Sequence, residues 1–168
     1  MGQGTNSFTN VQLSRYVSAL ANRGTVFELS LLDKVTDSDG NMIKDFTPEI
    51  SSQIEIQDST WDAVAQGMRG VIANGSAARI FRDLPIEIAG KTGTAQESTT
   101  RGNHAWFISY GPYTSPEIAV TVNIPYGYSS SNAATLAKHV YELYYGYTTL
   151  DEILDSGAIG ASNVTIGD

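Results

Sequence analysis

Residues 104–124, HAWFISYGPYTSPEIAVTVNI, decide the fold because they hold two apolar runs separated by a short segment rich in turn-forming residues. The second run alternates between large apolar residues and smaller or polar ones, which is typical of a strand with one buried face. Its large apolar positions are Ile118, Val120, Val122 and Ile124. The segment 111–116 is too short for a crossover helix, so strands 104–110 and 118–124 are predicted to pair antiparallel.

Amphipathic patterns on both sides of this pair predict three helices. The first begins after Thr9, because Gln12 follows three residues later at the spacing of a capping box, and Gly24 suits its end. The second is predicted over about 58–74 and the third over about 132–145. Each has an apolar face that needs a sheet to cover.

Further strands are predicted upstream of residue 104. The runs 26–36 and 42–46 flank Asp37-Ser38-Asp39-Gly40, a turn signal that indicates a hairpin. The run 86–95 is predicted to be a third antiparallel strand beside the pair 104–124. The expected fold class is therefore α+β, an antiparallel sheet covered by helices, followed by a single helical turn at 150–154.

Composition limits the classes of function. The 168 residues are the length of one domain, and no apolar run approaches a membrane span. A net charge of -8, with only ten scattered Lys and Arg residues, argues against nucleic-acid binding. The absence of cysteine excludes disulfides, zinc–thiolate sites and thiol nucleophiles.

Residues 90–96, GKTGTAQ, place an ammonium group and two hydroxyls at the end of an apolar strand. Strand alternation sends Lys91 and Thr92 to opposite faces, so one ligand meets both only beside the edge of the strand. Gly90 and Gly93 indicate close approach by a ligand or another backbone. Such an edge suits a carboxylate and a developing oxyanion. The alternative is that Lys91 is a solvated lysine that protects a sheet edge.

K-T-G is also the third motif of the serine acyltransferases that include penicillin-binding proteins and β-lactamases. The sequence resembles the C-terminal half of a class B (monofunctional) penicillin-binding protein transpeptidase domain over about residues 2–146. The matching segments are Gly2-Gln3-Gly4, residues 20–25 (LANRGT), residues 88–96 (IAGKTGTAQ), His104-Ala105-Trp106-Phe107 and residues 118–122 (IAVTV). The resemblance implies the penicillin-binding protein/β-lactamase-like transpeptidase fold and a peptidoglycan D,D-transpeptidase.

The resemblance also implies a role for each residue of the motif. The catalytic residues would be Lys91, which would contact the serine of a second motif, S-x-N, and Thr94, whose backbone N–H would be an oxyanion donor. Thr92 and Thr94 would hold the terminal carboxylate of a D-Ala-D-Ala stem peptide or of a β-lactam. Gly93 would give the ligand room beside the strand, and Gln96 would line the mouth of the site. No metal or cofactor is implied.

The sequence departs from the family in one respect: no serine is followed three residues later by lysine, as the first motif S-x-x-K requires. Ser130-Ser131-Asn132 matches S-x-N, but it follows K-T-G, whereas the family's motif precedes it. Ser130 or Ser131 is therefore interpreted as a helix cap. The nucleophile is expected outside these residues, and this chain alone is expected to be inactive.

The resemblance gives a domain division and a set of partners. Residues 1–146 would be the C-terminal portion of the transpeptidase domain, and residues 147–168 a weakly structured tail. The partners would be the stem peptide or a β-lactam and the missing N-terminal half, with self-association of the uncovered surfaces. The parent protein would act on the extracytoplasmic face of the bacterial cell membrane.

The same residues are compatible with other functions. A non-catalytic module that binds a ligand or a partner stays open, while a β-lactamase fits the GQG and Gln96 segments less well. His104 and His139 lack the spacing of metal ligands, and His104 is expected at a strand start near the site's rim. Arginines near the motif are expected to be solvated, although a peptide carboxylate is an alternative partner; they are Arg79, Arg82 and Arg101.

Overall fold

The computed structural model describes residues 7–97 and 99–160 of the chain, with side chains to residue 156. The elements follow in the order α1 (Asn10–Ala21), β1 (Thr25–Phe27), β2 (Lys34–Thr36), β3 (Met42–Asp45), β4 (Ile50–Gln53), α2 (Asp58–Ala73), α3 (Ala78–Phe81), β5 (Ala89–Ala95), β6 (His104–Gly111), β7 (Ile118–Ile124), α4 (Ser130–Tyr144) and α5 (Leu150–Gly160). Gly2-Gln3-Gly4 and the last part of the predicted tail, 161–168, lie outside the described residues.

The central sheet is antiparallel, with strand order β5-β6-β7. Its register pairs Thr92 with Phe107 and Phe107 with Val122. The short segment between β6 and β7 connects neighbouring strands, as residues 104–124 predicted. The α+β class is therefore confirmed, and the strand expected over 86–95 is β5.

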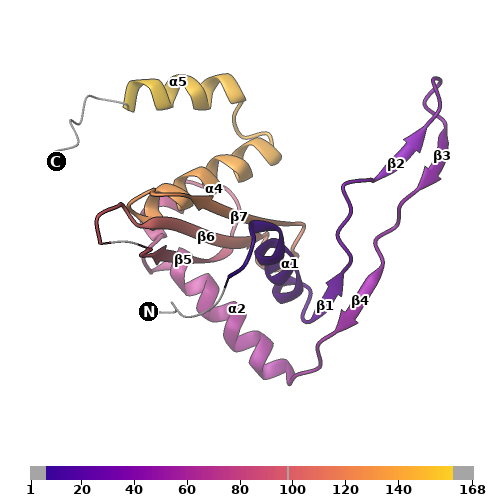
Figure 1. The fold of residues 1–168 in the computed structure, drawn as a ribbon, viewed down its shortest axis with the longest axis horizontal. Helices are drawn as coiled ribbons and strands as arrows, with labels where there is room; N and C mark the ends of the chain where they lie inside the picture. Colours follow the sequence, from indigo (N-terminus) through magenta and orange to yellow (C-terminus); the bar gives the residue numbers. More distant parts are fainter. Residues whose placement is uncertain (1–6, 98, 161–168) are drawn as a thin grey trace.

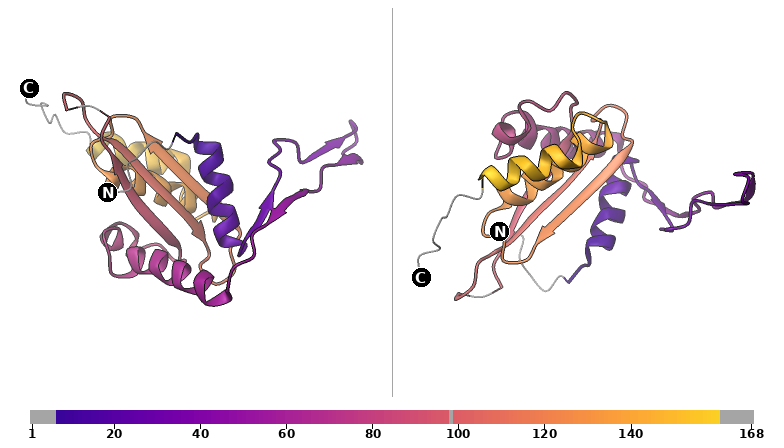
Figure 2. Two further views of the ribbon diagram at one scale, coloured as in Figure 1. Left: turned by 60° about the horizontal axis from the view of Figure 1, so that its bottom comes forward. Right: turned by 90° about the horizontal axis from the view of Figure 1, so that it is seen from above.

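Helices cover both faces of this sheet, with α4 on one face and α1 on the other (Figure 1, Figure 2). On the α4 face the largest core cluster contains Phe107, Val120, Val122 and Tyr141. On the α1 face a smaller cluster contains Val17, Ala89 and Tyr110. Helix α2 packs along β5 and contributes to both clusters, Ile72 to the first and Met68 to the second. The strand that carries the K-T-G motif therefore contacts α2 and α4 as well as its neighbouring strand β6.

The N-terminus of α1 is fixed by the predicted capping box. The Thr9 hydroxyl accepts the backbone N–H of Gln12 at 3.2 Å, and the Gln12 side chain accepts the backbone N–H of Thr9 at 2.8 Å. Gly24 follows the helix with φ +98°, and a Cβ there would collide with the carbonyl oxygen of Ile54. Glycine is therefore required where the chain leaves α1.

Residues 25–54, called the arm below, form a long two-stranded ribbon that extends away from the rest of the molecule (Figure 1). Its base is the β1–β4 pair and its outer part is the β2–β3 pair. Between them the ribbon continues through backbone bonds from Glu28 to Glu49 and from Phe46 to Asp33. Leu31 is fully exposed, and β2, β3 and β4 are exposed along their whole length.

The arm and the helix ends differ from the predictions. The strand expected over 26–36 is broken into β1 and β2, and β4 and the four-residue helix α3 were not predicted. The cap of α4 is Ser129, whose hydroxyl accepts the N–H of Ser131, so the assignment to Ser130 or Ser131 was wrong. Three consecutive serines can each cap a helix, and packing decides among them. Helix α5 extends well past the single turn expected at 150–154.

Within the described residues, no helix combines the length and apolarity needed to cross a bilayer.

Candidate functional site

Strand β5 places Lys91 and Thr92 on opposite faces of the sheet. Lys91 pairs across the strand with Ile108, which packs against the cluster on the α1 face. Thr92 pairs with Phe107, which is fully buried in the cluster on the α4 face. Within the described residues β5 has a hydrogen-bonded strand on one side only. A ligand that touches both side chains would therefore lie along the side of β5 that faces away from β6.

The two threonines of the motif share a face. Thr94 pairs with Ala105, two positions along β5 from Thr92, and both Ala105 and Phe107 belong to the α4-face cluster. Residues two apart on a strand are separated by about 6.6 Å. A carboxylate between them could accept one hydroxyl on each oxygen at about 2.7 Å. Thr94 is exposed and Thr92 is half-buried.

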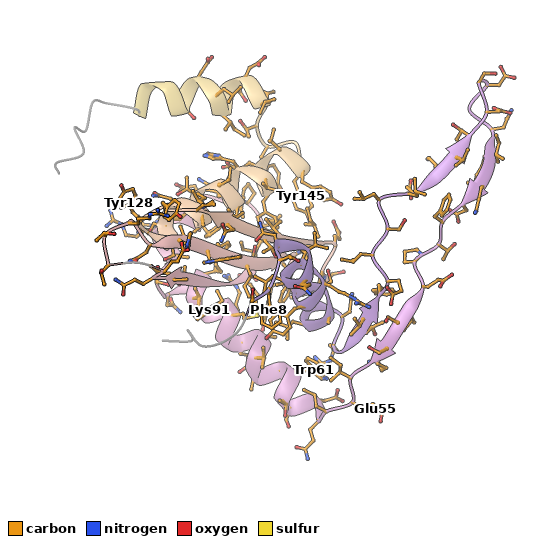
Figure 3. All side chains as sticks on the ribbon, in the orientation of Figure 1. Phe8, Glu55, Trp61, Lys91, Tyr128 and Tyr145 are labelled. Atoms are coloured by element: carbon orange, nitrogen blue, oxygen red, sulfur yellow. The ribbon has the colours of Figure 1, made fainter. Side chains whose placement is uncertain are left out.

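The Lys91 ammonium stays close to the strand. Its Nζ donates to the carbonyl oxygen of Thr92 at 2.7 Å, and the side chain is exposed (Figure 3). A cation held at the strand by one carbonyl keeps two further N–H donors. The arrangement can therefore attract an anion to this part of β5 or donate to a hydroxyl opposite it.

The glycines of the motif differ from each other. A Cβ on Gly90 would lie 2.7 Å from the Phe107 ring and 3.0 Å from the carbonyl oxygen of Ile108. Of the two alternatives that the sequence left for Gly90, a ligand or another backbone, its close neighbours are therefore the backbone and core side chains of β6. A Cβ on Gly93 would touch Trp106 at 3.2 Å and, apart from the two neighbours of Gly93 in the chain, would meet no other described residue within 4 Å.

A serine that the sequence did not single out touches the motif. The hydroxyl oxygen of Ser76, in the turn between α2 and α3, lies 3.0 Å from that of Thr92. The two residues are 16 positions apart and belong to different elements. No local pattern links them, so only the packing of α2 along β5 could have revealed the contact.

Past the motif, four side chains form a network that joins the end of β5 to the turn before α4. His104, the first residue of β6, lies 2.9 Å from a carboxylate oxygen of Glu97, and its other ring nitrogen accepts the N–H of Tyr126 at 3.2 Å. Arg101 donates to the Tyr126 hydroxyl at 2.9 Å. The hydrogen bond from His104 lowers the pKa of Glu97, with smaller contributions from Tyr126 and Arg101.

This network fixes the rim of the candidate site. Tyr126 and Tyr128 have φ values of 55° and 60°, in the left-handed region, and the N–H of Tyr128 donates to the carbonyl oxygen of Asn103 at 2.9 Å. Tyr128 lies at the end of the sheet where β5 leads toward β6 (Figure 3). The predicted position of His104 at a strand start is confirmed. Gln96 directly follows β5 and is exposed.

The remaining polar candidates differ in their surroundings. Arg101 belongs to the network, while Arg79 and Arg82 are exposed on and beside α3. His139 is half-buried on α4, 2.9 Å from a carboxylate oxygen of Glu142. Among the described residues no group of three His, Asp or Glu side chains is placed to hold a metal ion.

Comparison with known proteins gives consistent matches. The model of the family described as "Penicillin binding protein transpeptidase domain" matches residues 1–142. The peptidoglycan D,D-transpeptidase MrdA of Haemophilus influenzae is 31% identical over 166 residues, which cover 86% of this chain and 25% of the relative. The chain thus spans about a quarter of the length of this curated relative.

Solved structures show the same fold. The crystal structure of Pseudomonas aeruginosa PBP2 in complex with WCK 5153 superposes with a TM-score of 0.69 at 34% identity, over 85% of this chain and 32% of the other. Penicillin-binding protein 2B of Streptococcus pneumoniae strain R6 superposes with a TM-score of 0.73 at 25% identity, over 85% of this chain and 25% of the other. The expected transpeptidase fold and the resemblance stated from the sequence are confirmed.

Proposed function

The chain belongs to the penicillin binding protein transpeptidase domain family, and on that basis we propose that it forms the K-T-G side of a peptidoglycan D,D-transpeptidase site. In the reaction proposed for the whole protein, a serine attacks the peptide bond of a D-Ala-D-Ala stem peptide and the terminal D-Ala leaves with a proton. An amine of a second stem peptide then attacks the acyl-enzyme, and the serine regains its proton. β-Lactams would acylate the same serine.

The observation that carries this proposal is the layout of β5. Thr92 and Thr94 share one face at the spacing that can hold a carboxylate between two hydroxyls, and Lys91 supplies a cation at the same strand. We assign Thr92, Gly93, Thr94 and Gln96 to substrate binding. We assign Lys91 to the electrostatics of proton transfer and the Thr94 N–H to the oxyanion, a donor worth roughly 3 kcal/mol of barrier.

We also propose a division of the chain into two parts. Residues 1–146 would be the C-terminal portion of the transpeptidase domain and residues 147–168 its tail. Because the sequence contains no S-x-x-K, the nucleophile would come from residues outside this sequence, and the chain alone would not turn over substrate. The same observation favours a second candidate, a non-catalytic module that keeps the carboxylate site.

Partners and location follow from the reaction. The stem peptide or a β-lactam would occupy β5, and the other half of the transpeptidase domain would complete the site. The protein would act on the outer face of the bacterial cell membrane, where peptidoglycan is assembled. Exposed apolar side chains on α1, such as Val11 and Tyr16, would promote self-association of the isolated chain, which light scattering would detect. A monodisperse monomer would count against that part of the proposal.

Binding of N-acetyl-D-Ala-D-Ala tests the carboxylate site without requiring catalysis. In an isotope-labelled chain, this peptide is expected to shift the amide signals of residues 92–94, and its C-terminal amide is expected to bind more weakly. Thr94→Val removes one hydroxyl at nearly constant shape and is expected to weaken binding of the acid about tenfold or more, since a hydrogen bond to a charged group contributes about 1.5–3 kcal/mol. Thr135→Val, on the exposed face of α4, is the control. Equal affinity for acid and amide would exclude the proposed site.

A further inference from the structure

Ser76 lies outside β5, yet its hydroxyl oxygen is 3.0 Å from that of Thr92. Ser76 is exposed and Thr92 is half-buried, so the pair stands at the surface where a ligand of β5 would arrive. A contact between two hydroxyls uses one of their two protons. The other proton stays available to a third group.

The position of Ser76 is set by the backbone on both sides of it. The N–H of Ala77 donates to the carbonyl oxygen of Val71, and the N–H of Ala78 donates to that of Gly75, both at 3.1 Å. Ala77 is fully buried. Ser76 is therefore presented on a turn that is anchored in the core, not on a freely moving loop.

Both hydroxyls rest on the same packed layer. Phe81 of α3, which follows the Ser76 turn, stacks on Phe107 with ring centroids 5.4 Å apart. Phe107 is the cross-strand partner of Thr92. The stacking of these two rings holds the turn against β5. It therefore keeps the hydroxyls of Ser76 and Thr92 within contact distance.

The number of protons determines what the pair can bind. When Ser76 donates to Thr92, the Thr92 proton points outward and can be given to an anionic oxygen. When Thr92 donates to Ser76, the Thr92 hydroxyl offers a ligand no proton. An anion beside Thr92 selects the first arrangement, and the donation from Ser76 polarises the Thr92 hydroxyl and strengthens the bond that it makes.

We propose that Ser76 is a positioning residue of the carboxylate site: it donates to Thr92 and so directs the Thr92 proton toward a ligand that ends in a carboxylate. This inference rests on the proposed function of β5. Ser76 would not touch the ligand. It would hold one χ1 rotamer of Thr92 and would make the site favour an acid over the corresponding amide.

The test compares Ser76→Ala with Ser76→Thr, which keeps the hydroxyl, and with Ser30→Ala, which removes another exposed serine with local hydrogen bonds in the arm. Two properties are measured by NMR in the labelled chain: the χ1 rotamer of Thr92 without ligand, from three-bond couplings, and the affinities for N-acetyl-D-Ala-D-Ala and its C-terminal amide. Dispersed amide spectra confirm that each variant is folded.

Ser76→Ala is expected to average the Thr92 rotamer and to weaken binding of the acid about five- to tenfold while changing binding of the amide less than twofold. Ser76→Thr and Ser30→Ala are expected to match the original chain. If Ser76→Ala leaves the rotamer and the affinity for the acid unchanged, the inference is wrong. Equal losses of affinity for the acid and the amide would show that Ser76 only stabilises the packing of α2 on β5. That result would also overturn the inference. If the original chain does not prefer the acid, the proposed carboxylate site itself fails, and the role of Ser76 fails with it.

Discussion

Tyr141 on α4 donates its phenol hydrogen bond to the hydroxyl of Ser109 on β6 at 3.0 Å, and both side chains are fully buried. The Ser109 hydroxyl in turn donates to the carbonyl oxygen of Val120 on β7 at 3.4 Å. Burial raises the pKa of Tyr141 well above its ordinary value, so the phenol stays protonated. This chain of donors attaches α4 to the middle of the sheet.

Removing both partners of this pair is expected to cost less than the sum of the two single removals. Ser109→Ala leaves a buried phenol without an acceptor and should lower the free energy of unfolding by about 1–3 kcal/mol. Tyr141→Phe should cost about 1 kcal/mol. The double variant should cost less than the sum of the two, by about 1 kcal/mol, in urea denaturation. Strictly additive losses would show that the hydrogen bond contributes nothing to stability.

Gly90→Ala is expected to destabilise the fold. The new Cβ would lie 2.7 Å from the Phe107 ring and 3.1 Å from the Ser109 Cβ, so the core beneath β5 must shift. Overpacking of this kind costs about 1–3 kcal/mol. The control is Gly67→Ala in α2, where a Cβ meets no described group within 4 Å beyond the adjacent backbone of its own helix and should stabilise the helix by about 0.5–1 kcal/mol. A lower midpoint of thermal unfolding for Gly90→Ala and a higher one for Gly67→Ala would agree with this account. A higher midpoint for Gly90→Ala would contradict it.

Acid is expected to weaken the network of Glu97, Arg101, His104 and Tyr126 that forms the rim of the candidate site. The pKa of Glu97 in the folded chain is lowered from 4.5, chiefly by the hydrogen bond from His104. A carboxyl group with a lowered folded pKa contributes stability that is present above its unfolded pKa and is lost as the pH falls through the folded value. The amide signals of Tyr126 and Tyr128 should therefore change as the pH falls below about 4.5.

Glu97→Gln should remove this part of the pH dependence, because the amide does not titrate. Glu55→Gln, an exposed glutamate just beyond the arm, is the control and should titrate like the original chain at Tyr126 and Tyr128. If Glu97→Gln shows the same acid transition at these two amides, another group holds the rim.

The isolated chain is expected to form no covalent adduct with benzylpenicillin. No serine is followed by lysine at the spacing of the nucleophile motif, and Ser130 and Ser131 lie in the first turn of α4. Intact mass after incubation should equal that of the untreated chain. A stoichiometric increase in mass located to one serine by peptide mapping would contradict this and would identify a nucleophile within the 168 residues.

Local patterns predicted the elements whose neighbours in sequence determine them. The capping box at Thr9 and Gln12 fixed the start of α1, and the alternation from Ile118 to Ile124 matched β7. The arm was harder, because its strands are exposed and bury no periodic apolar face. Strand β4 in particular has two serines at its centre and no alternation of apolar residues.

The site divides in the same way. The strand from Lys91 to Thr94 is contiguous, so its chemistry can be read along the chain. The contact between Ser76 and Thr92 depends on how α2 packs beside β5, which no local spacing encodes. The role of Gly90 stayed open for a related reason: glycine marks close approach, but only the packing of β5 against β6 shows that the approaching groups are the Phe107 ring and the Ile108 carbonyl.

The arm gives the protein a place that tolerates added sequence. Its outer turn is closed by Asp37, whose carboxylate accepts the N–H groups of Asp39 and Asn41, and every residue from 36 to 45 is exposed. A reporter domain inserted at Gly40, where a Cβ would meet no described residue within 4 Å apart from its chain neighbours, would disturb none of the described core contacts. Such a fusion would leave β5 unobstructed, and its fluorescence would report the amount of the chain in an extract.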